Sequence, residues 1–185
     1  MPITQLDPHT ALVLIDLQKG IVGMPTAHPS SDVVARAAEL AAAFRRHQLP
    51  VVLVNVVGGA PGRTDPQPAR PAAGADWAEL VPELGAQPQD IRISKKTWGA
   101  FTDTELAATL RGRGVTQVVL AGIATSIGVE STARQAHELG FNVTLAIDAM
   151  TDRNEQAHAN SVERIFPRLG ETGSSSDILA KLEVR

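Results

Sequence analysis

The 185-residue chain contains no cysteine. This absence excludes disulfide bonds, cysteine-ligated zinc, iron–sulfur clusters and every mechanism that uses a thiolate. A large excess of one charge is also lacking, since 17 basic residues stand against 20 acidic ones and the net charge is −3. We therefore expect neither nucleic acid nor an anionic membrane surface as a partner.

Long apolar runs are missing as well. The longest span about seven residues, which is too short to cross a bilayer. The first eight residues, Met-Pro-Ile-Thr-Gln-Leu-Asp-Pro, have no basic stretch followed by an apolar core, so we expect no signal peptide and a cytoplasmic location. What is present is 43% apolar residues, enough for one buried core. We expect a single domain over residues 1–185.

Four short runs rich in β-branched residues predict buried strands. Their apolarity is nearly continuous, which is typical of parallel strands covered on both faces. A fifth, weaker candidate covers residues 91–94. The four runs are Ala11–Ile15, Val51–Val57, Val115–Ala121 and Phe141–Ile147, and the last is expected to stop at Asp148.

Helical patterns alternate with these strands. Apolar residues recur at helical spacing after Ser30, and Thr102-x-x-Glu105 predicts a capping box at the start of another helix. Further helices are expected over residues 128–139, 154–166 and after 174–177. This alternation predicts an α/β fold with a doubly wound sheet. The irregular segment Gly58–Asp90 is expected to be functional or partly helical, with Trp77 as its anchor.

Two charged side chains are predicted to meet beyond the strands. In open α/β sheets the ligand lies at the carboxyl ends of the strands, and Asp16 and Lys95 both follow predicted strands. Lysine stabilises an ionised aspartate, whereas burial favours the neutral acid, so such a pair can exchange a proton near neutral pH. The segment Gly122–Gly128 is expected to offer backbone N–H groups to a carboxylate or oxyanion.

Three motifs resemble those of the isochorismatase-like hydrolases and occur in that family's order. They are Asp16-Leu17-Gln18, Lys95-Lys96-Thr97-Trp98-Gly99-Ala100-Phe101 and Gly122-Ile123-Ala124-Thr125-Ser126-Ile127-Gly128-Val129-Glu130-Ser131-Thr132-Ala133-Arg134. The resemblance covers essentially the whole chain. It implies a mainly parallel sheet of about six strands in the order 3-2-1-4-5-6.

The same resemblance implies roles for individual residues. Asp16 and Lys95 correspond to the catalytic pair, and a cis peptide bond is implied between Ile123 and Ala124. Substrate contacts are expected from Ile123, Ala124 and Thr125. Relatives assemble as dimers or larger, so we expect a homo-oligomer.

Gly128 departs from most of the family, which carries a nucleophilic cysteine at this place. Thioester chemistry, and with it amidase activity of the nicotinamidase type, is therefore excluded. True isochorismatases also have glycine here, and the resemblance implies that they use the aspartate as an acid. The Asp-x-His of nicotinamidases is replaced by Asn55-Val56-Val57, so we expect no metal site and no cofactor.

Three further candidates each have two interpretations. Gln18 either binds substrate or holds the Asp16 loop, and Arg63 either binds a substrate carboxylate or is a mobile surface residue. Trp98 either stacks on the substrate or fills the core or an interface. Lys96 is expected to be solvated.

Two alternative functions remain open from the sequence. Ser126, Asp148 and His158 follow the chain order of an α/β-hydrolase triad, and Ala124–Gly128 nearly matches a nucleophile elbow. However, His158 falls inside a predicted helix only ten residues after Asp148. The other alternative is a non-catalytic ligand-binding or assembly protein that retains the pocket. Our leading interpretation is a cysteine-independent hydrolase of a small carboxylate- or carbonyl-bearing molecule.

Overall fold

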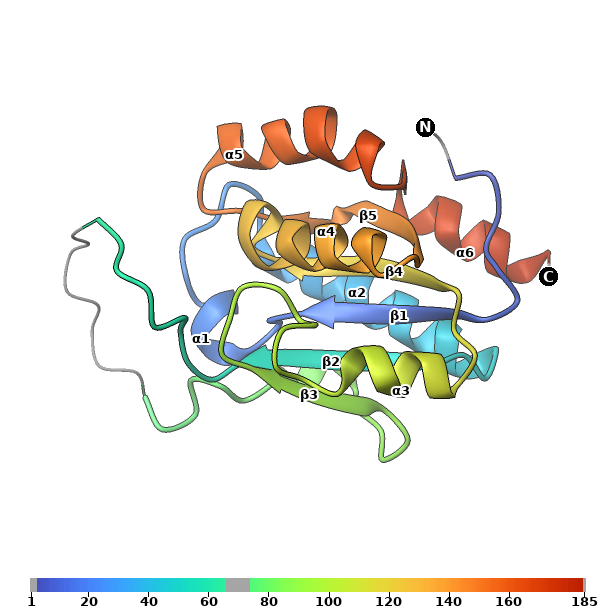
Figure 1. Ribbon diagram of the computed structural model, residues 1–185, viewed down its shortest axis with the longest axis horizontal. Coiled ribbons are helices and arrows are strands. Elements are labelled where there is room, and N and C mark those ends of the chain that lie inside the picture. Colours follow the sequence, from blue (N-terminus) through green and yellow to red (C-terminus); the bar gives the residue numbers. More distant parts are fainter. Residues whose placement is uncertain (1–2, 66–73, 185) are drawn as a thin grey trace.

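A parallel β-sheet forms the centre of the structure (Figure 1). The computed structural model describes residues 3–65 and 74–184. Within these ranges six strands lie in the order β3-β2-β1-β4-β5-β6, and neighbouring strands are parallel. The predicted α/β class and strand order are therefore confirmed. The strands are β1 (Thr10–Ile15), β2 (Val51–Val56), β3 (Ile91–Lys95), β4 (Gln117–Ile123), β5 (Asn142–Thr151) and β6 (Glu171–Gly173).

Helices cover both faces of this sheet (Figure 1). One face packs against α2 (Ser30–Arg46) and α6 (Ser175–Glu183). The other packs against α3 (Leu106–Gly112) and α4 (Glu130–Glu138). The remaining helical elements of the described chain are short: α1 (Lys19–Val22), α5 (Glu155–Asn160), the π-helical turns Thr125–Val129 and Ser161–Ile165, and the 3₁₀ turns Pro82–Leu84 and Phe166–Arg168.

Strand β1 shows why the apolar runs are continuous. Leu12 and Leu14 belong to the core cluster that contains α2, whereas Val13 and Ile15 belong to the cluster that contains α3 and α4. Successive side chains of a strand point to opposite faces, so a strand covered on both faces needs apolar residues at every position. None of the helices within the described ranges is long and apolar enough to cross a membrane.

Strand β5 is longer than the sequence predicts. It continues through Asp148 to Thr151, after a register shift against β4 between Leu120 and Gly122. The expected stop at Asp148 is therefore wrong. Its carboxylate accepts hydrogen bonds from the backbone N–H and the hydroxyl of Ser175, at 2.6 and 2.8 Å, and it contacts Arg36 at 3.4 Å. Partners on two helices thus satisfy a charged residue within the strand.

Two predicted helix starts also differ from the structure. The capping box predicted at Thr102 does not form: α3 begins at Leu106, and the Thr102 hydroxyl accepts a hydrogen bond from Gln135 at 2.6 Å instead. Thr104 accepts the backbone N–H of Leu106 instead, at 3.3 Å. The helix expected from Gly128 begins as the π-helical turn Thr125–Val129 and becomes α4 at Glu130. At the start of α6, by contrast, the cap expected over residues 174–177 does form, as a capping box between Ser174 and Asp177.

The segment between β2 and β3 follows an irregular path over its described parts. Residues 66–73 lie outside the described residues, and the part before them leads away from the sheet (Figure 1). The part after them returns to the carboxyl edge, where the carbonyl oxygen of Trp77 accepts the backbone N–H of Gly20 at 3.0 Å. A side chain at position 20 would overlap the Trp77 indole ring. Trp77 therefore anchors this segment.

Candidate active site

Asp16 and Lys95 form a buried ion pair at the carboxyl edge of the sheet. Asp16 follows β1, Lys95 is the last residue of β3, and β2 lies between these strands. The Lys95 Nζ atom donates to Asp16 Oδ2 at 2.8 Å, and the two side chains are only 1% and 7% exposed. Lys95 Nζ also donates to the carbonyl oxygen of Thr97 at 3.1 Å. The two residues predicted to meet are thus in direct contact.

Burial makes the carboxyl group of Asp16 a weaker acid than usual. Desolvation raises the pKa of Asp16 from its ordinary value of 3.8 to about 6, against the opposing charge and hydrogen bond of Lys95. The second carboxyl oxygen, Oδ1, is buried and has no hydrogen-bond partner among the described residues. An unpaired buried oxygen favours the protonated acid, or a ligand group that bonds to it.

The backbone around Asp16 is held in an uncommon conformation. Asp16 has a φ of +53°, in the left-handed region, and its N–H donates to the carbonyl oxygen of Val54 at 3.0 Å. Gly122 of β4 lies against Ile15, so closely that a Cβ atom at position 122 would overlap the Ile15 carbonyl group. A left-handed backbone conformation costs free energy in residues other than glycine, and such residues concentrate at functional sites.

Gly128 lies beside this pair. A Cβ atom built at position 128 would be 3.2 Å from Asp16 Oδ2 and 3.7 Å from the Trp98 carbonyl oxygen. It would also be 2.8 Å from the Cγ2 methyl group of Ile15, which is closer than real Cβ atoms approach. The structure therefore brings Asp16, Lys95 and Gly128 together, and it has no room for a side chain at position 128 unless Ile15 moves.

The π-helical turn Thr125–Val129 offers fewer free backbone groups than the sequence suggests. The N–H groups of Ile127 and Val129 both donate to the carbonyl oxygen of Ala124, at 3.2 and 3.1 Å. The N–H of Ser126 donates to Asp152 Oδ2 at 2.8 Å. The N–H groups of Ser126 and Ile127, two of those that we expect to face an anion, are therefore already bonded within the protein. The peptide bond that precedes the turn, between Ile123 and Ala124, is cis.

The predicted substrate-binding side chains lie in different environments. Ile123 and Thr125 are buried, whereas Ala124 is partly exposed. The Thr125 hydroxyl hydrogen-bonds to Nδ1 of His158 at 2.9 Å. Trp98 is 62% exposed, although its carbonyl oxygen faces Gly128. Arg63 is exposed on the segment that leads away from the sheet.

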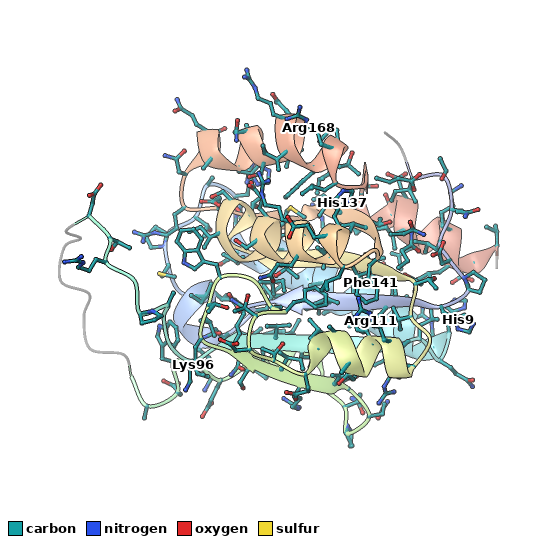
Figure 2. The ribbon with its side chains drawn as sticks, viewed as in Figure 1. His9, Lys96, Arg111, His137, Phe141 and Arg168 are labelled. Carbon is teal, nitrogen blue, oxygen red and sulfur yellow. The ribbon has the colours of Figure 1, made fainter. Side chains whose placement is uncertain are left out.

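Gln18 is buried, and its amide binds backbone on both sides. Its Nε2 donates to the carbonyl oxygens of Val56 and Trp77, both at 3.1 Å, and its Oε1 accepts the N–H of Val56 at 2.8 Å. These bonds tie the Asp16 loop to β2 and to the Trp77 segment. The geometry favours the structural interpretation of Gln18. Lys96 is exposed at the same end of the sheet, consistent with the solvated role expected for it (Figure 2).

Ser126, Asp148 and His158 do not form a catalytic triad. The Ser126 hydroxyl donates to Asp152 Oδ2 at 2.8 Å, His158 bonds to Thr125, and Asp148 bonds to residues of α6 and α2. None of the hydrogen bonds found for these three described residues joins one of them to another. A serine nucleophile would need an imidazole as its base.

Several residues that shape the site were not predicted from the sequence. Thr132 on α4 donates to the carbonyl oxygen of Gly128 at 2.7 Å and accepts the N–H of Ala100 at 3.1 Å, so it links the turn to the segment after Lys95. Asp152 binds Ser126, as described above. Asp152 directly follows β5, but the predicted strand stops at Asp148, so the sequence pattern does not mark Asp152 as a candidate.

Comparisons with known proteins agree with this architecture. Residues 10–177 match the isochorismatase domain. The chain is 43% identical over 182 residues to YwoC, an uncharacterized isochorismatase family protein of Bacillus subtilis (strain 168), with 94% of each chain covered. It is 44% identical over 183 residues to YecD, another uncharacterized member from Escherichia coli O157:H7, covering 94% of this chain and 96% of YecD.

A solved structure of a family member has the same fold. An isochorismatase family protein from Burkholderia thailandensis superposes with a TM-score of 0.92 at 44% identity, and the alignment covers 97% of this chain and 98% of that one.

Proposed function

Since the chain belongs to the isochorismatase family, we propose that it is a cysteine-independent hydrolase. Its substrate is a small molecule that carries a carboxylate or carbonyl group, and Asp16 is the general acid and base. The observation that carries the proposal is the buried pair: Lys95 Nζ lies 2.8 Å from Asp16 Oδ2, while Asp16 Oδ1 has no partner among the described residues. One oxygen is thus fixed by the protein and the other is left for the substrate.

The proposed reaction is hydrolysis of a vinyl ether. Protonated Asp16 donates its proton to the vinyl carbon, whose π electrons form the new C–H bond and leave an oxocarbenium ion. Water adds to this ion, and the Asp16 carboxylate takes one proton from the added water. The resulting hemiketal separates into a carbonyl compound and an alcohol as its hydroxyl proton moves to the leaving oxygen. Asp16 is then protonated again.

Lys95 has its role after the first proton transfer. At that point Asp16 is an anion in a site with little water, and the ammonium group at 2.8 Å stabilises it. The same charge limits the rise in the pKa of Asp16, so the acid can both give and recover a proton near neutral pH. Because Gly128 has no side chain, nothing at this position contacts Asp16 Oδ2, as a Cβ atom there would.

Two exposed residues complete the proposal. The Trp98 side chain is exposed beside the backbone that faces Gly128, and we assign it to the mouth of the site, where its ring covers bound substrate. Arg63 is assigned to the substrate carboxylate, which its guanidinium group can bind with two hydrogen bonds. Arg63→Ala should raise KM more than it lowers kcat.

A screen of vinyl ethers and small carboxylates by mass spectrometry tests the proposal. On a substrate that is turned over, Asp16→Asn should lower kcat by about 10²-fold or more, because the amide cannot donate and recover a proton. Asp103→Asn is the matched control, since it makes the same chemical change at an exposed position. Wild-type turnover by Asp16→Asn would contradict the assignment.

The burial of Asp16 favours one alternative, a non-catalytic protein that binds a ligand or assembles with other copies. Only 7% of the Asp16 side chain is exposed, so a substrate needs an opening of the site to reach it. Under this alternative no compound in the screen is converted. A ligand found by calorimetry would then bind the wild type and be recovered unconverted.

A further inference from the structure

We propose that His158 is a positioning residue that sets the conformation of the π-helical turn Thr125–Val129 through the hydroxyl group of Thr125. The effect on catalysis rests on the function proposed above, whereas the effect on the turn does not. The inference starts from a hydrogen bond between two elements that are far apart in the chain. Thr125 Oγ1 and His158 Nδ1 are 2.9 Å apart, across a separation of 33 residues.

The Thr125 hydroxyl depends on this one bond. Thr125 is fully buried, and His158 is the partner that its hydroxyl has among the described residues. A buried hydroxyl that donates to an imidazole nitrogen has its hydrogen satisfied, whereas one that only accepts leaves its hydrogen without a partner. The favoured state is therefore a neutral His158 whose Nδ1 accepts from Thr125 and whose Nε2 carries the proton.

The turn that Thr125 begins carries the site. Gly128, three residues further on, lies against Asp16 and Ile15. Two other side chains hold the turn: Asp152 accepts from the N–H and hydroxyl of Ser126, and Thr132 donates to the Gly128 carbonyl oxygen. His158 holds the end of the turn that follows the cis peptide bond. Loss of the hydrogen bond between Thr125 and His158 frees Thr125, the first residue of the turn, whereas Gly128 is still held by Thr132.

The His158 ring can exchange protons with solvent. It lines a cavity of about 270 Å³ together with His28, and the two ring centroids are 4.8 Å apart. Burial and then the nearby His28 lower the pKa of His158, whereas Asp152 and Glu155 act in the opposite direction. The other charged residues that line the cavity are Asp32, Arg36 and Asp148. His158 is therefore neutral at neutral pH and becomes charged only in more acidic solution than an ordinary histidine.

Protonation reverses the hydrogen bond. A charged imidazole is a donor at both nitrogens, so Thr125 must accept and its own hydrogen loses its partner. We expect the turn to shift in acid, and with it the contact between Gly128 and Asp16. In a pH–rate profile, kcat should therefore fall on the acid side while KM changes little, because the turn positions Asp16 rather than the remote groups of the substrate.

A matched set of variants tests this inference. The amide of asparagine occupies the place of Nδ1 in histidine, and the longer glutamine places its amide near Nε2. His158→Asn should therefore keep the bond to Thr125 and His158→Gln should lose it. Thr125→Ser keeps the hydroxyl, whereas Thr125→Val has nearly the same shape without it.

The first measurement needs no substrate. Nitrogen-15 NMR of the wild type should show His158 as the Nε2–H tautomer at neutral pH, and the amide resonance of Gly128 should shift as His158 titrates. Because Asp16 beside Gly128 also titrates, the pH series is recorded in an Asp16→Asn background, in which adding His158→Asn should remove the acid shift of Gly128. His158→Gln and Thr125→Val should show the displaced Gly128 resonance at every pH. A Gly128 resonance that stays unchanged in these two variants, or an Nδ1–H tautomer, overturns the inference.

The second measurement uses any substrate found in the screen. His158→Gln and Thr125→Val should lower kcat about tenfold, the loss expected for one hydrogen bond, with His158→Asn close to wild type and Thr125→Ser more active than Thr125→Val. Equal kcat in all four variants contradicts the positioning role. Asp16→Asn separates the two proposals, because it should lower kcat by about 10²-fold or more and yet keep the response of Gly128 to the titration of His158.

Discussion

Replacing Lys95 with methionine should raise the pKa of Asp16. Methionine has a similar length and no charge, so it fits the 1%-exposed position of the Lys95 side chain without burying an unpaired cation. In the wild type, desolvation raises the pKa of Asp16 to about 6, and the charge and hydrogen bond of Lys95 act against that rise. Without Lys95 only the desolvation remains.

The size of the shift follows from the contact geometry. An opposite charge within hydrogen-bond distance lowers the pKa of a carboxyl group by about one to three units, and that much should be regained. With a pKa of about 6, roughly a tenth of the wild-type molecules carry a protonated Asp16 at pH 7. In Lys95→Met the protonated form should be at least about half of the population at pH 7.

Carbon-13 NMR of selectively labelled aspartate can follow this titration in a chain of 19.5 kDa. The Asp16→Asn variant identifies the resonance, and circular dichroism shows whether Lys95→Met keeps the fold. If turnover is found, the alkaline limb of kcat/KM should move by the same amount, although kcat should fall because ionised Asp16 has lost its partner. A pKa that stays near 6 or falls in Lys95→Met would refute the reasoning that Lys95 controls this acid.

Three other outcomes follow from the structure. The unfolding free energy of the wild type relative to Asp16→Asn should fall by about 2.4 kcal/mol between pH 4 and 7, because the folded pKa of about 6 lies above the ordinary 3.8 and ionisation is therefore less favourable in the folded state. Denaturant titrations at each pH measure this difference, and a constant difference would contradict it. Gly122→Ala should lower the free energy of unfolding by about 4 kcal/mol or more, since the φ of Gly122 is +127° and a Cβ atom would overlap Ile15. The control Gly140→Ala, at a φ of +85° with open space around it, should lower it by about 1–2 kcal/mol in the same denaturant titration. A fluorophosphonate probe should leave Ser126 unlabelled, because its hydroxyl is bonded to a carboxylate rather than to a histidine, and labelling detected by peptide mass spectrometry would restore the serine mechanism.

The main strands and the meeting of the charged pair could be predicted because they depend on local patterns. Strands covered on both faces must be apolar at nearly every position, and this is visible in the runs that became β1, β2 and β4. The carboxyl ends of parallel strands share one edge, so a polar residue directly after a strand has only one region to occupy. This rule predicts that Asp16 and Lys95 lie close together, and their contact at 2.8 Å agrees with it.

Long-range partners could not be predicted from such patterns. Asp148 was expected to end a strand because it is charged, but Ser175, 27 residues later, satisfies its carboxylate within β5. The same holds for Gln18, whose amide pairs with backbone 38 and 59 residues away. A side chain's partner depends on which elements the fold places beside it, and the local sequence does not contain that information.

The packing at Gly128 limits the order in which substitutions can accumulate at this site. A cysteine placed there first would have its Cβ atom only 2.8 Å from the Ile15 methyl group, so that single change disturbs the strand that leads to Asp16. Alanine or leucine at position 15 lacks that methyl branch and would have to come earlier. The two positions are epistatic, and a laboratory lineage selected for thiol chemistry should change residue 15 before residue 128.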